Sequence, residues 1–173
     1  MSTTATGEDI WRGNELTPAP TSHTSIPTPA AAGEQMSVVS EDANDTSGGT
    51  GVREVRIHSL DASGNEQTED LILSGLTGVD LVASNTRFIN DFYSIDAGSN
   101  GAAVGNIKIY NKATVGLVYD MLHVGGNKSL VPHYMVPLGK TLVLKGWHAT
   151  EAKDKRCAFR IRSTDMRNVL LPG

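Results

Sequence analysis

The feature that most constrains this sequence is a pair of β-type runs joined by a short polar turn. In the first run, "VREVRIHSL" (residues 52–60), Val55 and Ile57 fall on one side of an extended chain, and Arg56 and His58 fall on the other. The turn residues "DASGN" follow, and then comes a second run, "EQTEDLILS". This order predicts a β-hairpin with one apolar and one polar face.

Similar short runs recur after residue 35, separated by segments rich in Gly, Asn and Asp. They are "MSVVSE" (36–41), "NIKIY" (106–110, with Ile107 and Ile109 inward), "VGLVYDMLHV" (115–124), two short strands around the turn "PLGK" within 131–150, and "RCAFRIRST" (156–164). "GLTGVD" reads as a turn.

The region of residues 85–97 fits more than one pattern. Phe88, Ile89, Phe92 and Tyr93 share a helical face, but part of the same region also alternates as a strand. We interpret it as a short turn or helix at 85–89 followed by a strand at 91–97.

About eight or nine short strands with little helix predict an all-β fold. The spacing favours an antiparallel β-sandwich, jelly-roll-like, because two packed sheets leave fewer exposed edges than one open sheet. We assign this domain to residues 36–165 and a short C-terminal tail to 166–173.

Residues 1–35 have a different composition and predict an extended N-terminal arm. The stretch "DIWRGNELTPAPTSHTSIPTPAAAGEQ" (9–35) is rich in Pro, Thr, Ser and Ala, and its prolines favour extended backbone. A solvated linker has no use for Ile10 and Trp11, so we expect the arm to bind a partner. The predicted partner-binding residues are Ile10, Trp11, Arg12, Leu16, Pro18, Pro20, Ile26, Pro27 and Pro29.

Composition narrows the classes of function. The chain has 173 residues, a formal net charge of −4 and a pI near 5.7, which disfavours direct nucleic-acid binding. Its one cysteine, Cys157, allows no intramolecular disulfide. The N-terminus lacks the pattern of a secretory signal, and no span approaches the roughly 20 apolar residues of a membrane helix. We therefore expect no membrane association and folding in a cytoplasm.

No residue pattern with catalytic spacing emerges. "LGKT" (138–141) lacks the glycine and the helix of a phosphate-binding loop, no "GxSxG" elbow occurs, and the five histidines form no close pair. We predict a protein that is not an enzyme and has no catalytic residue, metal site or cofactor. One alternative stays open: Glu41, Asp42, Asn44 and Asp45 offer oxygen ligands for calcium, although a solvated turn fits their spacing better.

A second candidate interface lies near the C-terminus. Arg156, Arg160 and Arg162 alternate with Cys157, Phe159 and Ile161, so they are expected on the outer face of a strand. They would meet an acidic protein surface or nucleic acid, or they would form a solvated face paired with nearby carboxylates.

The order of three segments carries a family resemblance. "TGVREVRIHSLDASGNEQTEDLILSG", then "RFINDFYSIDAGSNGAAVGNIKI", then "HYMVPLGKTLVLKGWHAT" resembles structural proteins encoded in the virion modules of tailed bacteriophages. The resemblance covers roughly residues 52–164 as a general pattern and carries over no catalytic residues.

The resemblance implies a place in a virion. The leading hypothesis is a capsid cement or decoration protein on the capsid surface, made in the host cytoplasm, which binds the major capsid protein as a dimer or trimer and staples neighbouring subunits. The alternatives are a neck, tail or fibre-attachment component and, third, a carbohydrate-binding module for host attachment. The low aromatic content of 5% disfavours the third hypothesis.

Overall fold

The computed structural model describes residues 29–130 and 133–146. The chain divides into two units, residues 9–142 and the two ends, 1–8 with 143–173. The fold described below belongs to the first unit. Of the second unit only residues 143–146 are described, and they are exposed and have no regular secondary structure.

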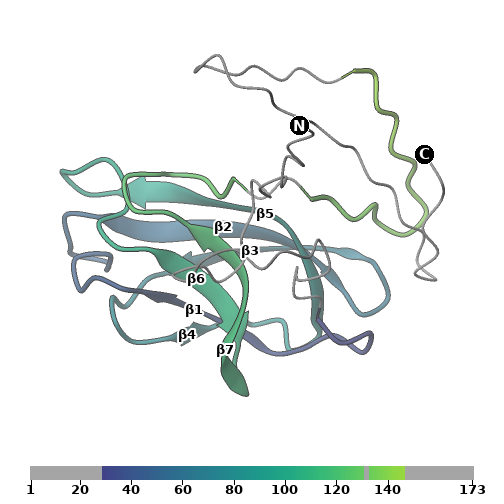
Figure 1. Cartoon of the computed structure of the whole chain (residues 1–173), viewed down its shortest axis with the longest axis horizontal. Coiled ribbons are helices and arrows are strands. Elements are labelled where there is room, and N and C mark those ends of the chain that lie inside the picture. Colours follow the sequence, from purple (N-terminus) through teal and green to yellow (C-terminus); the bar gives the residue numbers. More distant parts are fainter. Residues whose placement is uncertain (1–28, 131–132, 147–173) are drawn as a thin grey trace, which may run out of the picture. The chain divides into compact units, whose positions relative to one another are not determined.

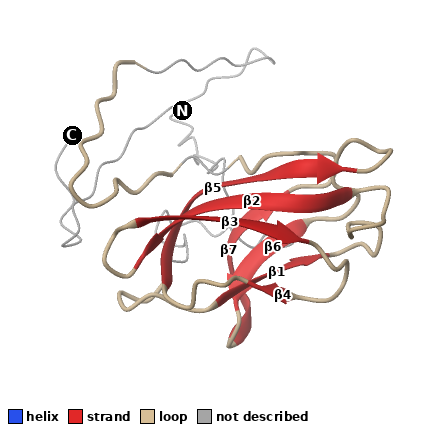
Figure 2. Cartoon of the chain, turned by 180° about the vertical axis from the view of Figure 1, so that it is seen from behind, coloured by secondary structure: helices blue, strands red, loops and turns tan. Residues whose placement is uncertain are grey.

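The described residues contain seven strands and no helix. The strands are β1 (Met36–Ser40), β2 (Val52–Asp61), β3 (Glu66–Ile72), β4 (Val79–Asp80), β5 (Thr86–Ala97), β6 (Ile107–Asn111) and β7 (Thr114–Leu122). They form a four-stranded sheet in the order β4-β1-β6-β7 and a three-stranded sheet in the order β3-β2-β5 (Figures 1 and 2). Every strand pair is antiparallel, which confirms the predicted all-β sandwich.

The β2–β3 hairpin forms as its alternation predicts. Val55 and Ile57 are buried, whereas Arg56 pairs with Asp70 and His58 with Thr68 on the outer face. The Asp61 carboxylate closes the turn by accepting hydrogen bonds from the backbone N–H groups of Ser63 and Asn65. A hydrogen bond from the side-chain amide of Asn65, followed by these backbone hydrogen bonds, lowers the pKa of Asp61.

One hydrophobic core joins the two sheets. Val55, Ile57 and Phe92 of the three-stranded sheet belong to the same buried cluster as Ile107 and Ile109 of the four-stranded sheet. The predicted inward orientation of Ile107 and Ile109 is thus confirmed.

The prediction of a turn or helix at residues 85–89 is wrong. Strand β5 begins at Thr86 and pairs with β2 along nearly its whole length. Its register shifts so that His58 faces Asp91 while Ser59 faces Ile89, which leaves Asn90 as the extra residue of a β-bulge. The bulge turns both Ile89 and Phe92 toward the core, and this spacing of three residues imitated a helix.

Two other expectations need correction. "GLTGVD", interpreted as a turn, contains the short strand β4. Residues 133–146, expected to hold two strands around "PLGK", contain none, although Pro137–Lys140 does form a turn. Apolar alternation favours a strand only when a partner offers ladder hydrogen bonds, and here backbone groups bond to side chains and loops instead.

Residues 29–35 pack on the sandwich. Pro29 is buried, and the backbone of Glu34 exchanges hydrogen bonds with that of Thr86 at 2.8 and 3.0 Å. Gly33 adopts φ of 73°, and a Cβ there would lie 2.1 Å from the Asn85 carbonyl oxygen, so this turn requires glycine. The strand expected at 156–164, the tail at 166–173 and residues 1–28 of the arm lie outside the described residues.

Candidate functional site

An exposed apolar row lies on the segment that follows the last strand. Tyr134, Leu138 and Leu142 recur every four residues and are 53%, 67% and 57% exposed. In the other unit, the next residues, Val143 and Leu144, are also exposed. We call Tyr134, Leu138 and Leu142 the apolar row.

The backbone that carries the apolar row is fixed to the three-stranded sheet. The Asn90 side chain donates to the Met135 carbonyl at 2.9 Å and accepts from the Met135 N–H at 2.8 Å. Leu138 N–H donates to the Gly64 carbonyl at 2.8 Å, and Pro137 between them is buried. The row therefore presents apolar side chains on a backbone that is already ordered, which lowers the entropy cost of binding a partner.

The bulge in β5 explains how this segment is anchored. Asn90 is the extra residue, so its amide is released from the regular alternation and reaches the Met135 backbone. Next to it, His133 Nε2 lies 3.0 Å from the Ile89 carbonyl oxygen, and its ring packs edge-on against Phe88. A hollow of about 300 Å³ separates the segment from Glu66 at the start of β3.

The outer face of the three-stranded sheet carries a polar network. Arg56 binds Asp70 through two hydrogen bonds of 2.7 Å, and His58 lies within hydrogen-bonding distance of Thr68 and Tyr93. The Asp70 hydrogen bonds raise the pKa of Arg56, and Arg56 lowers the pKa of Asp70. These charges satisfy one another across the strands, so we interpret the network as a feature that stabilises the sheet.

The Asp/Asn-rich loop uses its carboxylates to hold the sandwich together. The Asp45 side chain is 0% exposed and accepts hydrogen bonds from Ser40 Oγ at 2.6 Å and from the N–H groups of Val52, Val104 and Gly105 at 2.8 to 3.0 Å. Gly51 must be glycine, because a Cβ there would lie 2.0 Å from Asp45 Oδ1.

The other acidic residues of the loop bind different neighbours. Glu41 pairs with Lys108, whose hydrogen bond lowers the pKa of Glu41, and Asp42 binds Asn44 within the loop. Among the described residues, no three His, Cys, Asp or Glu side chains gather as metal ligands would. The donors that suggested calcium therefore serve hydrogen bonds within the protein.

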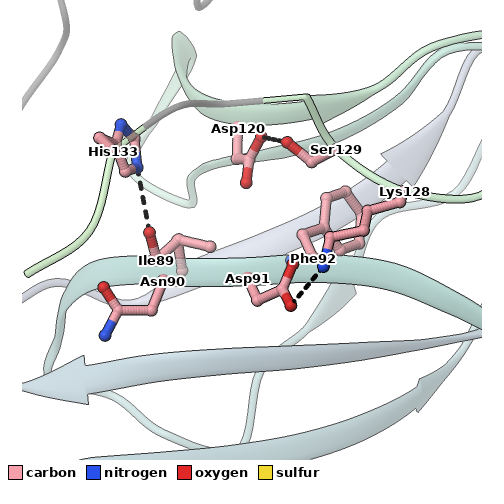
Figure 3. A pocket seen from close by; sticks show the side chains of 8 residues that line it. All are labelled: Ile89, Asn90, Asp91, Phe92, Asp120, Lys128, Ser129 and His133. Atoms are coloured by element: carbon pink, nitrogen blue, oxygen red, sulfur yellow. Dashed lines mark hydrogen bonds and ion pairs between the residues drawn. The ribbon is translucent and has the colours of Figure 1, made fainter. Parts of the chain in front are cut away.

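A small polar cavity lies between β5 and the chain that leaves β7 (Figure 3). Asp91 and Lys128 form an ion pair of 2.8 Å at its rim, and Ser129 Oγ donates to the buried Asp120 carboxylate. Burial raises the pKa of Asp120 to about 7, although the hydrogen bonds from Ser129 and the Met121 N–H oppose the shift. Burial lowers the pKa of His133, which lines the same cavity.

Most of the residues predicted to bind a partner lie outside the described residues. These are Ile10, Trp11, Arg12, Leu16, Pro18, Pro20, Ile26 and Pro27 of the arm and Arg156, Arg160 and Arg162 near the C-terminus. Pro29 is the exception, and it is buried. For the residues outside the described part of the chain, partner binding therefore stays a prediction.

Sequence reasoning missed the apolar row and the Asp120 cavity. The row was hidden because residues 131–150 were expected to form strands that bury their apolar side chains. Asp120 did leave a signal, since it interrupts the apolar run "VGLVYDML", and a charge at such a position is buried if the strand lies in a core.

No family model, curated protein or solved structure matches this chain. Within the described ranges, no helix has the length and apolar character needed to cross a membrane. The function is therefore inferred from the sequence, the fold and the surface features of the chain.

Proposed function

We propose that this chain is a non-enzymatic structural protein of a bacteriophage virion and acts as a capsid cement or decoration protein. In this role it binds the major capsid protein on the capsid surface and staples neighbouring subunits. The apolar row is the observation that carries the proposal, because three large apolar side chains stand exposed on an ordered backbone. Their burial against a partner is favourable, and little further ordering opposes it.

The sandwich supports this role as a rigid platform. Its core is shared by both sheets, and its buried polar side chains are tied to the backbone of distant loops, as Asp45 shows. The sequence resemblance to virion proteins and the Pro-rich residues 1–28, which hold Ile10 and Trp11, favour an assembly role. A dimer or trimer of the chain would repeat the apolar row on the assembled particle.

The test measures binding of the purified chain to phage heads assembled without it. A triple variant, Tyr134→Ser, Leu138→Ser and Leu142→Ser, should bind at least about tenfold more weakly, because a few central apolar contacts dominate most interfaces. The matched control changes Ile72, Val82 and Val115 to serine, since these are large apolar side chains at least as exposed as Tyr134 but lie elsewhere. Equal affinity of both triple variants would exclude the apolar row as the docking surface.

The contribution of the arm is tested with a chain that begins at Pro29. This boundary keeps Gly33, Glu34 and Gln35, whose contacts belong to the sandwich, so a binding defect reports on residues 1–28 rather than on misfolding. We expect weaker binding of the truncated chain, with an unchanged unfolding midpoint.

The number of copies per particle separates cement from the alternative of a neck, tail or fibre-attachment component. Hundreds of copies spread over the shell are expected for a cement protein. Three, six or twelve copies at one vertex would replace the cement proposal by that alternative.

A further inference from the structure

The cavity in Figure 3 has a volume of about 190 Å³ and a mostly polar lining. Asp91 and Asn90 come from the bulged part of β5, Asp120 comes from β7, and Lys128 and Ser129 come from the segment that covers the edge of β5. Strand β5, strand β7 and the segment after β7 therefore build the site together. Backbone hydrogen bonds between β5 and that segment, at Ser94–Asn127 and Ser129–Phe92, both 2.8 Å, hold its two sides in place.

Asp120 is the unusual member of this lining. It is 2% exposed, which is rare for a carboxylate, and none of the described residues forms an ion pair with it. Oδ1 accepts hydrogen bonds from Ser129 Oγ and from the Met121 N–H. Oδ2 accepts no hydrogen bond from any residue that the structure describes, and it points toward the space above Asn90 and Asp91 in Figure 3.

None of the described charged groups around the cavity neutralises the negative charge of an ionised Asp120. Lys128 is bound to Asp91 at 2.8 Å, and it also lies over the Tyr93 ring, 5.5 Å from its centroid. His133 is held against the Ile89 carbonyl oxygen, and burial lowers its pKa, so it supplies no charge at neutral pH. Asp91, close to Asp120, disfavours its ionisation and adds a second negative group to the lining.

We propose that this cavity binds a primary alkylammonium group, with Asp120 Oδ2 as its main acceptor. Two of the three N–H donors of such a group match carboxylate oxygens on the lining, Asp120 Oδ2 and those of Asp91, and the third can face water. The ammonium replaces the missing positive partner of Asp120, and about 190 Å³ is enough space for the group and part of its alkyl chain. A lysine side chain of a partner and a free polyamine share this chemistry. The proposal is independent of the proposed role in a virion.

The experiment follows the Asp120 carboxyl resonance of the full-length chain by ¹³C NMR from pH 4.5 to 8.5. The probes are n-butylammonium and, at the same ionic strength, tetramethylammonium, each at about 50 mM, a concentration that detects millimolar binding. Butylammonium should lower the pKa of Asp120 by about one unit, which at this concentration corresponds to a Kd of about 5 mM for the ionised form if the protonated form does not bind. Tetramethylammonium, which has no N–H donor, should leave it within about 0.2 units, since only screening acts.

Two controls keep the result specific. The pKa of Asp61, which lies in a turn on the surface, should not respond to butylammonium in the same titration. The variant Asp120→Asn keeps the shape of the side chain but loses the charge, and butylammonium should no longer shift the amide resonances of Asp91 and Ser129. Cadaverine and Nα-acetyl-lysine methylamide then distinguish the two sources of the alkylammonium group. Tighter binding of cadaverine indicates a polyamine, and tighter binding of the lysine derivative indicates a lysine side chain of a partner protein.

Two results would overturn the proposal. One is an Asp120 pKa that responds equally to butylammonium and tetramethylammonium, which would indicate screening alone. The other is an unchanged butylammonium response in Asp120→Asn. Neither result involves binding to phage heads. The proposal for the cavity and the proposal for the virion role can therefore be contradicted independently.

Discussion

At the scale of single residues, two buried carboxylates have opposite roles. Asp45 accepts four hydrogen bonds and joins the loop of residues 41–51 to that of residues 98–106. Asp120 is also buried, but among the described residues only its Oδ1 accepts hydrogen bonds. The first stabilises the sandwich through these four hydrogen bonds, whereas burial raises the pKa of the second to about 7.

Asp45→Asn tests the first role. The new amide NH₂ would face N–H donors, so at least one backbone donor loses its acceptor, and we expect a loss of about 2–4 kcal/mol in the free energy of unfolding. Urea denaturation measures it. Asp42→Asn in the same loop is the matched control and should cost less than about 1 kcal/mol, because the Asp42 carboxylate is at the surface and its hydrogen bonds go to the neighbouring Asn44, to which an asparagine oxygen can also bind.

Asp120 should make stability depend on pH. Its pKa is raised from 3.8 to about 7 in the folded chain, so its favourable contribution is complete below about pH 4. Between pH 4 and 7 the unfolded chain ionises while the folded chain keeps its proton, and stability falls as pH rises. Relative to Asp120→Asn, the wild type should lose up to about 4 kcal/mol across this range and nothing further above it. Unfolding curves at a series of pH values measure the difference, and parallel pH profiles would contradict the role of Asp120.

At the scale of elements, the contacts of residues 29–35 define where the sandwich begins. Glu34 accepts hydrogen bonds from Tyr119, Asn111 and the Ala30 N–H. Burial opposes ionisation, but these three hydrogen bonds together lower the pKa of Glu34. For Tyr119, burial, followed by the bond to Glu34, raises the pKa to about 12.

Glu34→Ala should release this segment without unfolding the sheets. We expect hydrogen exchange to accelerate at least about tenfold for the Gly33 and Glu34 amides, because the side-chain contacts that oppose local opening are lost. Amides of β2 should keep their protection. Glu66→Ala, an exposed glutamate on β3, is the control and should leave residues 29–35 unchanged.

At the scale of the whole molecule, the shared core predicts one cooperative transition for the sandwich. Phe92→Ala in the three-stranded sheet and Ile109→Ala in the four-stranded sheet each remove a fully buried side chain. Each should cost about 3–5 kcal/mol, and both sheets should lose hydrogen-exchange protection together. Val115→Ala, at an exposed position, should change stability by less than about 0.5 kcal/mol. Loss of hydrogen-exchange protection in one sheet while the other sheet keeps it would show that the sheets have two independent cores.

The sequence by itself determined the fold class and several elements. Strict alternation requires only that one face be buried, so Val55, Ile57, Ile107 and Ile109 could be oriented from their spacing alone. The turn at 61–65 was readable because its residues stabilise it locally, through the Asp61 side chain.

The tertiary structure decided what depends on distant partners. The bulge at Asn90 exists only through pairing with β2, and the irregular path of residues 133–142 follows from its hydrogen bonds to the Asn90 side chain. The two features with proposed functions, the Asp120 cavity and the apolar row, also depend on residues far apart in the sequence. The Asp120 cavity joins β7 to β5. The apolar row stays exposed because its segment bonds to the Asn90 side chain and to the turn at Gly64 rather than to the backbone ladder of a strand. Local periodicity carries no information on such contacts, because their energy comes from residues far apart along the chain.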